Sequence, residues 1–415
     1  MKDNKPDIRF EGFEEAWEEK QLKDLVNYSS TGIRVCDSDN SGKYELYDAN
    51  EVIGKINSFV SDSSFISIIK DGSGVGRVRL MPGYTSCIGT MGCLTSKDDN
   101  DINFIFSKLQ TKDFSKHIIS GAIPHVYFRD FGEDNTNVPK PKEQEKVGEF
   151  FRNLDELIEA KEQELEKLRH IKLALLDKMF PCDEPDNTNW GGYNRLIDSE
   201  LLMQNNLQIF PSKPNTPAIR FCGFSEPWKK ESLSKLITFG KGKGYSKNCI
   251  TKAGTPIILY GLLYTNYHTN IFSSTLYSKM YEWSVLSKGF EVIVPASGET
   301  AEDIARASAI LSKGIILGGD INILYPNNDI NSSFLALELT YGQTHRELVK
   351  KAQGISVVHI HNSDIEELSI CFPSYSEQKK IGEFFKEQDD NIANAQLQVI
   401  KLRNIKQALM EKMFA

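Results

Sequence analysis

Two segments of the chain occur twice in the same order, and this internal repeat constrains the fold more than any other feature. Residues 6–17 read PDIRFEGFEEAW, and residues 217–228 read PAIRFCGFSEPW. Residues 143–180 match residues 377–414 without a gap and are identical at about half of the positions. Between these blocks the two halves agree only weakly. The repeat predicts two variable units, each followed by a copy of the same helix.

The longer repeated block has the apolar spacing of an amphipathic helix. In both copies apolar residues recur at intervals of three and four, as in a coiled coil. At about 1.5 Å per residue each helix would be roughly 57 Å long, and it could not bury its apolar stripe without a partner. We expect the two helices to pack on each other in antiparallel orientation, since a duplicated block with a pseudo-two-fold axis offers each helix an equivalent surface. The predicted packing residues are Val147, Phe150, Leu154, Leu157, Leu165, Leu168, Leu175, Met179, Ile381, Phe384, Ile392, Val399, Leu402, Ile405, Leu409 and Met413.

Two further points bear on this packing. Glu143 and Glu377 lie near the start of each helix, where the helix dipole favours an anion. The alternative arrangement is that each apolar stripe belongs to the core of a separate globular domain. That alternative fits the length of the helices poorly, because helices of globular proteins usually run to about 10 to 14 residues.

Short β-branched runs bounded by Gly, Ser, Asp or Pro indicate strands in the variable units. Examples are residues 64–69, 291–295 and 355–360. The predicted fold class is therefore α+β, with two mixed α/β domains separated by the two long helices. The expected division is residues 1–140 and 212–375 for the two variable domains, 141–180 and 376–415 for the helices, and 181–211 for a connector with a short helix near Leu201.

Charge and composition place limits on function. The formal net charge is −8, although proteins that bind DNA unaided usually present a basic surface. Basic residues are concentrated locally in residues 239–252, which contain four lysines and no acid. No apolar run of about 18 residues and no signal-peptide pattern is visible, so we expect a cytoplasmic protein. The seven cysteines are scattered, which predicts reduced thiols and no metal site.

Three enzyme classes fit the sequence less well. The run FGKGKG at residues 239–244 is a weak signal for S-adenosylmethionine binding, and the chain has no N-P-P-[YF] or D-P-P-[YF] motif of an amino-methyltransferase. Asp7, Glu18 and Lys20 resemble part of a nuclease metal site, but the second copy of the block replaces all three while keeping its apolar frame. The G-x-x-x-x-G-K-[ST] phosphate loop of an ATP-driven motor is also missing from the sequence.

Each long helix is opened by the motif P-x-x-x-E-Q-x-K-[VI]-G-E-F-F and closed by L-R-x-I-K-x-A-L. The opening motif consists of Pro139, Glu143, Gln144, Lys146, Gly148, Phe150 and Phe151 in the first copy, and of Pro373, Glu377, Gln378, Lys380, Gly382, Phe384 and Phe385 in the second. Two dissimilar units of about 150 residues, each followed by this helix, resemble the specificity subunits of type I restriction-modification systems. The similarity covers essentially the whole chain.

The resemblance implies a non-catalytic, DNA-binding protein in which each variable unit is a target recognition domain. The two domains would read the halves of a bipartite, asymmetric target in double-stranded DNA, and the helices would separate them and bind two modification subunits. No cofactor is expected in this chain. S-adenosylmethionine would serve adenine methylation in the modification subunits, and ATP and Mg²⁺ would serve the motor and nuclease activities of the restriction subunits. A stiff spacer between two base-reading modules would permit only one half-site separation.

Two loops carry residue types that suit DNA contact. In the first unit a Gly-rich turn presents Lys70, Ser73, Arg77 and Arg79, and arginine can bind guanine or phosphate. In the second unit lysines and tyrosines suit phosphate and groove contact. The candidates there are Lys241, Lys243, Tyr245, Lys247, Tyr260, Tyr264 and Arg306. An ordinary hairpin and a tyrosine-containing β-rich core would contain the same residues, and the alternative function is a coiled-coil interaction scaffold whose variable units bind a ligand other than DNA.

Overall fold

The computed structural model describes residues 5–39, 41–181, 196–211, 215–354 and 357–414. Contacts divide the chain into two compact units: residues 1–163 with 396–415 form unit 1, and residues 164–395 form unit 2. The first long helix, α4 (Pro141–Met179), begins in unit 1 and ends in unit 2, and the second, α12 (Tyr375–Met413), begins in unit 2 and ends in unit 1. Each unit therefore contains the start of one long helix and the end of the other.

Unit 1 contains a β-rich variable domain built on two sheets. One sheet has the antiparallel order β2-β8-β5-β6, and the other has the order β4-β3-β7. Strand β5 is apolar at four of its five positions and is buried along its whole length, and α2 packs against it and β6. The strands are β1 (Glu18–Gln21), β2 (Val26–Ser30), β3 (Tyr44–Tyr47), β4 (Val52–Ile56), β5 (Phe65–Ile69), β6 (Val78–Met81), β7 (Thr85–Cys87), β8 (Met91–Ser96) and β9 (Asn135–Val138), with helices α1 (Leu22–Leu25), η1 (Val35–Asp37), α2 (Ile102–Gln110), η2 (Ser115–His117) and α3 (Phe128–Phe131).

Unit 2 contains a larger variable domain with two five-stranded sheets. Their strand orders are β13-β23-β19-β21-β16 and β14-β17-β15-β22-β18. Strand β19 is apolar and buried throughout, and α9 packs on it and on β21. The strands are β10 (Leu207–Ile209), β11 (Ile219–Phe221), β12 (Lys229–Ser232), β13 (Ile237–Lys241), β14 (Ile250–Thr251), β15 (Thr255–Ile258), β16 (Asn270–Ile271), β17 (Tyr277–Ser278), β18 (Leu286–Lys288), β19 (Val292–Pro295), β20 (Ser297–Gly298), β21 (Ser308–Ile310), β22 (Lys313–Leu317), β23 (Ile321–Pro326), β24 (Val358–His359) and β25 (Ser369–Phe372). The helices are α5 (Ser199–Gln204), α6 (Leu233–Leu236), η4 (Lys247–Cys249), α7 (Leu262–Thr265), α8 (Ala301–Ile304), α9 (Ser332–Tyr341), α10 (Gln343–Lys351) and α11 (Asn362–Glu366).

The predicted α+β class with two mixed domains is confirmed, and so are strands in the runs 64–69 and 291–295. The third run overlaps β24, but its residues 355–356 lie outside the described residues. In the proposed connector, residues 182–195 also lie outside them, and the expected short helix near Leu201 is α5.

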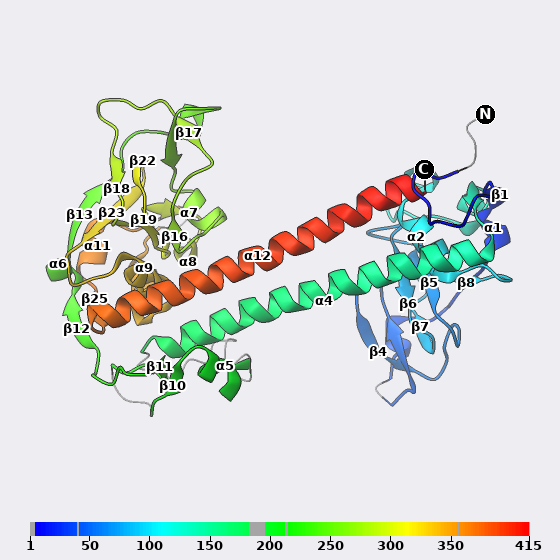
Figure 1. The fold of residues 1–415 in the computed structure, drawn as a ribbon, viewed down its shortest axis with the longest axis horizontal. Helices are drawn as coiled ribbons and strands as arrows, with labels where there is room; N and C mark the ends of the chain where they lie inside the picture. The colour runs from blue at the N-terminus through cyan, green and yellow to red at the C-terminus, as the bar shows by residue number, and fades with distance from the viewer. Residues whose placement is uncertain (1–4, 40, 182–195, 212–214, 355–356, 415) are drawn as a thin grey trace. The chain divides into compact units, whose positions relative to one another are not determined.

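Within each unit, the segments of the two long helices lie side by side and run antiparallel, as the sequence predicts (Figure 1). In both units, contact pairs that lie further along α4 involve residues that lie earlier in α12. The pairs that join the helices are Asp155–Lys406 (2.6 Å) and Glu162–Arg403 (2.7 Å) in unit 1, and Lys172–Asp389 and Phe180–Phe385 in unit 2. The helices therefore bury their stripes partly on each other and partly in the core of each unit.

The predicted apolar stripe is buried over most of its length, but the prediction is wrong at two positions. Leu157 is 46% exposed and Ile405 is 41% exposed. Ile158 is buried instead of Leu157, because a helix of 3.6 residues per turn drifts relative to a 3.5-residue repeat. Beside Ile405, the side chain of Lys406 turns toward the other helix to reach Asp155.

A buried arginine–glutamate pair attaches the start of each long helix to the short repeated block. In unit 2 Arg220 donates from Nε and Nη2 to Glu377 at 2.9 and 2.7 Å, and both side chains are 1% exposed. In unit 1 Arg9 makes the same two bonds to Glu143, each at 2.7 Å. The hydrogen bonds to Glu143 raise the pKa of Arg9 above its ordinary value. The two repeated blocks of the sequence are thus contact partners within each unit.

The glutamine after each glutamate reaches main-chain atoms of the variable domain. Gln378 Oε1 accepts from the backbone N–H of Asn331 at 2.9 Å. Its Nε2 donates to the carbonyls of Asp329 and Pro373 at 2.9 and 3.0 Å. The bonds of Gln144 in unit 1 are to the N–H of Asp101 (3.1 Å), the carbonyl of Pro139 (3.0 Å) and the side chain of Asn100 (3.1 Å). Each glutamine amide therefore makes three hydrogen bonds, with both of its N–H groups donating.

Each long helix also crosses the start of a short helix, α2 or α9, at a glycine. A Cβ on Gly148 would lie 2.1 Å from Oδ1 of Asp101, which caps α2, and 2.7 Å from the backbone nitrogen of Phe104. A Cβ on Gly382 would have Ser333 Cβ as its nearest neighbour, at 2.9 Å. The approach in unit 1 is so close that only glycine fits.

We expect Arg220→Ala to lower the free energy of unfolding by about 3–5 kcal/mol, because it leaves Glu377 as a buried, unpaired charge. Unfolding in urea, followed by circular dichroism, measures the change. The double variant Arg220→Met/Glu377→Leu serves as the control, since it removes both charges and should recover most of the stability. Equal instability of the single and double variants would contradict the role of the ion pair.

The two helix glycines should respond differently to alanine. We expect Gly148→Ala to destabilise the protein by about 1–3 kcal/mol, since the added methyl group overlaps backbone of α2. Gly382→Ala should cost less, because its nearest neighbour is a side-chain carbon and alanine favours a helix over glycine by about 1 kcal/mol. Thermal unfolding of both variants tests this order, and a Gly148→Ala protein more stable than Gly382→Ala would overturn it.

Candidate nucleic-acid interface

The predicted lysine cluster forms one exposed loop in unit 2, from the end of β13 through η4 to the residue after β14. Lys241, Lys243, Lys247 and Lys252 are all exposed. In the part of the chain that the structure describes, none of these four forms an ion pair. Their charge is therefore available to an anion in solution. We name residues 241–252 the lysine loop.

Tyr245 holds the lysine loop in place and is only 8% exposed. Its hydroxyl hydrogen-bonds to the carbonyl of Lys279 at 3.0 Å and to Oγ of Ser284 at 2.5 Å. Its ring lies 4.9 Å from that of Trp283. The prediction of a direct DNA contact does not suit Tyr245, because the ring is buried under its neighbours and the hydroxyl is already bonded. It positions the loop.

Two exposed aromatic residues beside this loop were missed in the sequence. Tyr281 and Trp283 are 43% and 48% exposed, and their rings stack 5.1 Å apart with 7° between the planes. The ammonium group of Lys279 lies 5.7 Å from the centre of the Tyr281 ring. The available signal was two large aromatic residues within three positions of the turn that precedes β18. We name Tyr281 and Trp283 the aromatic pair.

The remaining candidates of unit 2 lie near α7 and α8. Tyr260 and Tyr264 are half-buried, with ring centres 6.4 Å apart, and burial raises the pKa of Tyr264. Arg306 lies 3.9 Å from Asp303 and 5.8 Å from the ring centre of Tyr267. It also lines a cavity with residues from the end of α4. Arg306 therefore faces the long helix and not the lysine loop.

In unit 1 the two predicted arginines reinforce the turn between β3 and β4. Arg77 donates to the side chain of Asn50 at 2.8 Å and to the carbonyl of Ala49 at 2.5 Å. Arg79 donates to the carbonyl of Asn50 at 3.2 Å, and its guanidinium lies 5.1 Å from the ring centre of Tyr47. Both arginines remain exposed, and each has further N–H groups to donate. The structure thus brings these two candidates together on one side of the turn.

The other two candidates of the first unit lie in the Gly-rich turn itself. Lys70 is half-buried and pairs with Asp71 at 3.6 Å, whereas Ser73 is exposed. Gly72, Gly74 and Gly76 all have φ between 79° and 97°, which a side chain would disfavour. The glycines therefore define the path of the turn that presents Ser73.

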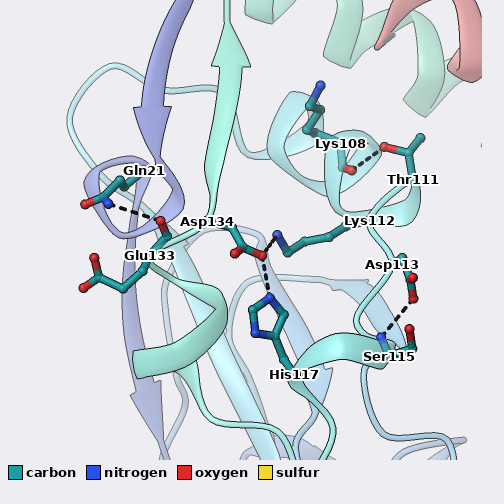
Figure 2. Close-up of polar contacts among 9 residues, drawn as sticks. All are labelled: Gln21, Lys108, Thr111, Lys112, Asp113, Ser115, His117, Glu133 and Asp134. Carbon is teal, nitrogen blue, oxygen red and sulfur yellow. Dashed lines mark hydrogen bonds and ion pairs between the residues drawn. The ribbon is translucent and has the colours of Figure 1, made fainter.

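A second polar cluster in unit 1 joins the end of α2 to the start of β9 (Figure 2). Lys112 and His117 both contact Oδ2 of Asp134, the histidine at 2.6 Å. Partial burial raises the pKa of Asp134, but the hydrogen bonds from Lys112 and His117 outweigh it, so the pKa is lowered. Asp134 Oδ2 thus accepts from two donors, and in the same cluster the backbone N–H of Ser115 bonds to Asp113 (Figure 2). The cluster therefore connects three segments of the domain.

The described residues contain neither a cluster of metal-ligating side chains nor a membrane-spanning helix. No group of three or more His, Cys, Asp or Glu side chains in that part of the chain could hold a metal ion. None of the helices within the same residues combines the length and the apolar character needed to cross a membrane.

Known proteins resemble this chain over most of its length. A family model described as the type I restriction modification DNA specificity domain matches residues 14–170 and 225–402. The specificity subunit of the type I restriction enzyme MjaIX from Methanocaldococcus jannaschii is 22% identical over 325 residues, which cover 76% of this chain and 69% of that protein. The crystal structure of the type I restriction-modification system S subunit from M. genitalium has a TM-score of 0.62 at 17% identity and covers 99% of each chain, so the two share a fold.

Proposed function

The chain belongs to the type I restriction-modification DNA specificity family, and from this premise we propose that it is the specificity subunit that reads a DNA target for a restriction-modification complex. The observation that carries the proposal is the duplicated match to the family model. Each copy of the match spans a variable domain and most of the long helix that follows it. The subunit is itself non-catalytic, and each variable domain is a target recognition domain.

We expect the target to be bipartite and asymmetric. The variable domain of unit 1 has a four-stranded and a three-stranded sheet, whereas that of unit 2 has two five-stranded sheets. Domains that differ this much offer different side chains to DNA, so the two half-sites have unrelated sequences. The long helices fix the number of base pairs between the half-sites, as the geometry of a symmetric dimer fixes half-site spacing.

Two modification subunits are the proposed partners of the long helices. Four apolar residues on the helices of unit 1 are exposed: Leu157 (46%), Leu397 (62%), Ile400 (45%) and Ile405 (41%). Large apolar side chains that stay exposed on one subunit are available for burial by a partner, and these four are the proposed contacts. S-adenosylmethionine would be bound by the modification subunits, and ATP and Mg²⁺ by the restriction subunits, all acting on DNA in the cytoplasm.

The alternative is an interaction scaffold whose variable domains bind a ligand other than DNA. The net charge of −8 favours it, because DNA-binding proteins are usually basic. The lysine loop opposes it, since its four lysines have no ion-pair partner among the described residues and offer a local cationic surface to phosphates. Binding to duplex DNA decides between the two functions.

Deleting the gene for this chain should abolish adenine methylation at one genomic motif. We expect that motif to consist of two different half-sites separated by a constant number of bases. Single-molecule sequencing of the host genome, with the gene intact, deleted and restored, measures the methylation directly. An unchanged methylation pattern in the deletion strain would contradict the proposed function.

The lysine loop should supply phosphate contacts in unit 2. In the complex with the modification subunits, we expect the triple variant Lys241→Gln/Lys243→Gln/Lys247→Gln to bind every duplex more weakly. The slope of log affinity against log salt should fall by up to about 3, because each phosphate contact contributes about 0.9. Fluorescence anisotropy with a labelled duplex at several salt concentrations measures both quantities.

A second triple variant controls for the loss of charge alone. Lys229, Lys230 and Lys235 are exposed lysines of the same unit on β12 and α6. Their replacement by Gln changes the net charge equally, but it should leave the salt slope close to that of the unmodified complex. Equal slopes for the two triple variants would show that the lysine loop makes no special contact.

A further inference from the structure

The aromatic pair leaves a large apolar surface in contact with water. Tyr281 and Trp283 are each more than 40% exposed, and Met280 beside them is 52% exposed. A contiguous exposed patch of large apolar side chains is typical of an interaction site, whereas single exposed apolar residues are common on any protein surface. The described residues cover one side of the pair and leave the rest open to solvent, so this surface is free to contact another molecule.

The charge around the aromatic pair identifies the chemistry of that molecule. Lys279 lies beside the Tyr281 ring, and the lysine loop contacts the pair through Gly244 and Tyr245. Glu282, which lies between Tyr281 and Trp283 in the sequence, is the one acidic residue of the segment 279–283. Five lysines against this one acid, in the lysine loop and residues 279–283, make an apolar surface framed by positive charge. A polyanion with accessible apolar groups fits such a surface, and duplex DNA is that kind of molecule.

The aromatic pair and the lysine loop form one rigid unit. The Tyr245 hydroxyl bonds to both ends of the segment 279–284, and Ser284 Oγ accepts from the backbone N–H of Tyr281 at 2.8 Å. A Cβ on Gly244 would lie 2.6 Å from the Trp283 ring, so the loop backbone packs directly against it. Side chains fixed in this way lose little entropy on binding, which favours a specific contact.

We propose that Tyr281 and Trp283 make the base-discriminating contact of unit 2, while the lysine loop holds the phosphates on either side. This inference rests on the proposed function and adds the residues that read the half-site. Phosphate contacts fix position and carry no sequence information, whereas apolar contacts in a groove distinguish bases, such as the methyl group of thymine. The uncharged rings would distinguish the bases, and the lysines would bind the phosphates.

The test uses the complex of this chain with its modification subunits. The probes are a duplex carrying the motif that loses methylation in the deletion strain and a shuffled duplex of the same composition. We expect Tyr281→Ala/Trp283→Ala to lose about tenfold to a hundredfold in affinity for the motif duplex and little for the shuffled one, the size of a lost base contact. The salt slope should stay unchanged, in contrast to the lysine variant, since no charge is removed.

Two further variants guard against a folding defect. Trp283→Phe keeps an aromatic ring against Gly244, and it should retain the fold while weakening discrimination. Phe272→Ala is the matched control, because Phe272 is 49% exposed in the same unit and lies 5.6 Å from the ammonium group of Lys386. It should leave binding to both duplexes unchanged. Circular dichroism of all variants reports whether unit 2 is folded.

The outcomes separate the inference from the function on which it rests. If the unmodified complex binds both duplexes equally, the proposed function fails. If it prefers the motif duplex and the folded Tyr281→Ala/Trp283→Ala and Trp283→Phe variants keep the same preference, only the inference about the aromatic pair fails. Loss of the preference with an unchanged salt slope supports it. Loss of affinity for both duplexes with a smaller slope overturns it, since the rings would then act through the phosphate contacts.

Discussion

The rest of the structure depends on how a long, charged helix is attached to a β-rich domain at one defined point. In each unit a bidentate arginine–glutamate pair forms inside the protein, where a single charge would cost several kcal/mol. The neighbouring glutamine makes three hydrogen bonds to the segments around it, and a glycine lets the helix backbone approach a capped short helix. Three residue types within six positions thus fix where the helix starts and which face it presents.

The two attachments are similar in design and differ in burial. In unit 1 the Trp17 indole N–H donates to Glu143 at 3.3 Å, and 13% of the Arg9 side chain remains exposed. In unit 2 Arg220 is 1% exposed, and neither its Nη1 nor the indole nitrogen of Trp228 has a hydrogen-bond partner among the described residues. The copy that is more deeply buried is therefore the one in which the polar groups are less completely satisfied. Unit 2 also has the larger apolar core, in which Trp228 packs against Phe334.

The repeat made the architecture predictable from the sequence, because two copies in one chain reveal what is kept without any alignment. The repeat did not predict which residues that are distant in the sequence contact each other. Arg9 and Glu143 both belong to repeated motifs, yet a repeat does not show that they touch across 134 residues, and the glutamate was explained by the helix dipole alone. The residue type of Tyr245 suggests a DNA contact, but its side chain is buried and holds the lysine loop against residues 279–284. Tyr281 and Trp283 lie at a turn, where no helix or strand periodicity predicts which side chains stay exposed.

The glutamine bonds have a consequence for how such chains diversify. Gln378 reaches the N–H of Asn331 and two carbonyl oxygens, all of them atoms that every residue carries in the same position except for the missing N–H of proline. An attachment that engages the main chain places few demands on side chains elsewhere in the domain. A domain of different sequence can therefore dock on the same helix, provided that its backbone places these three atoms in the same positions.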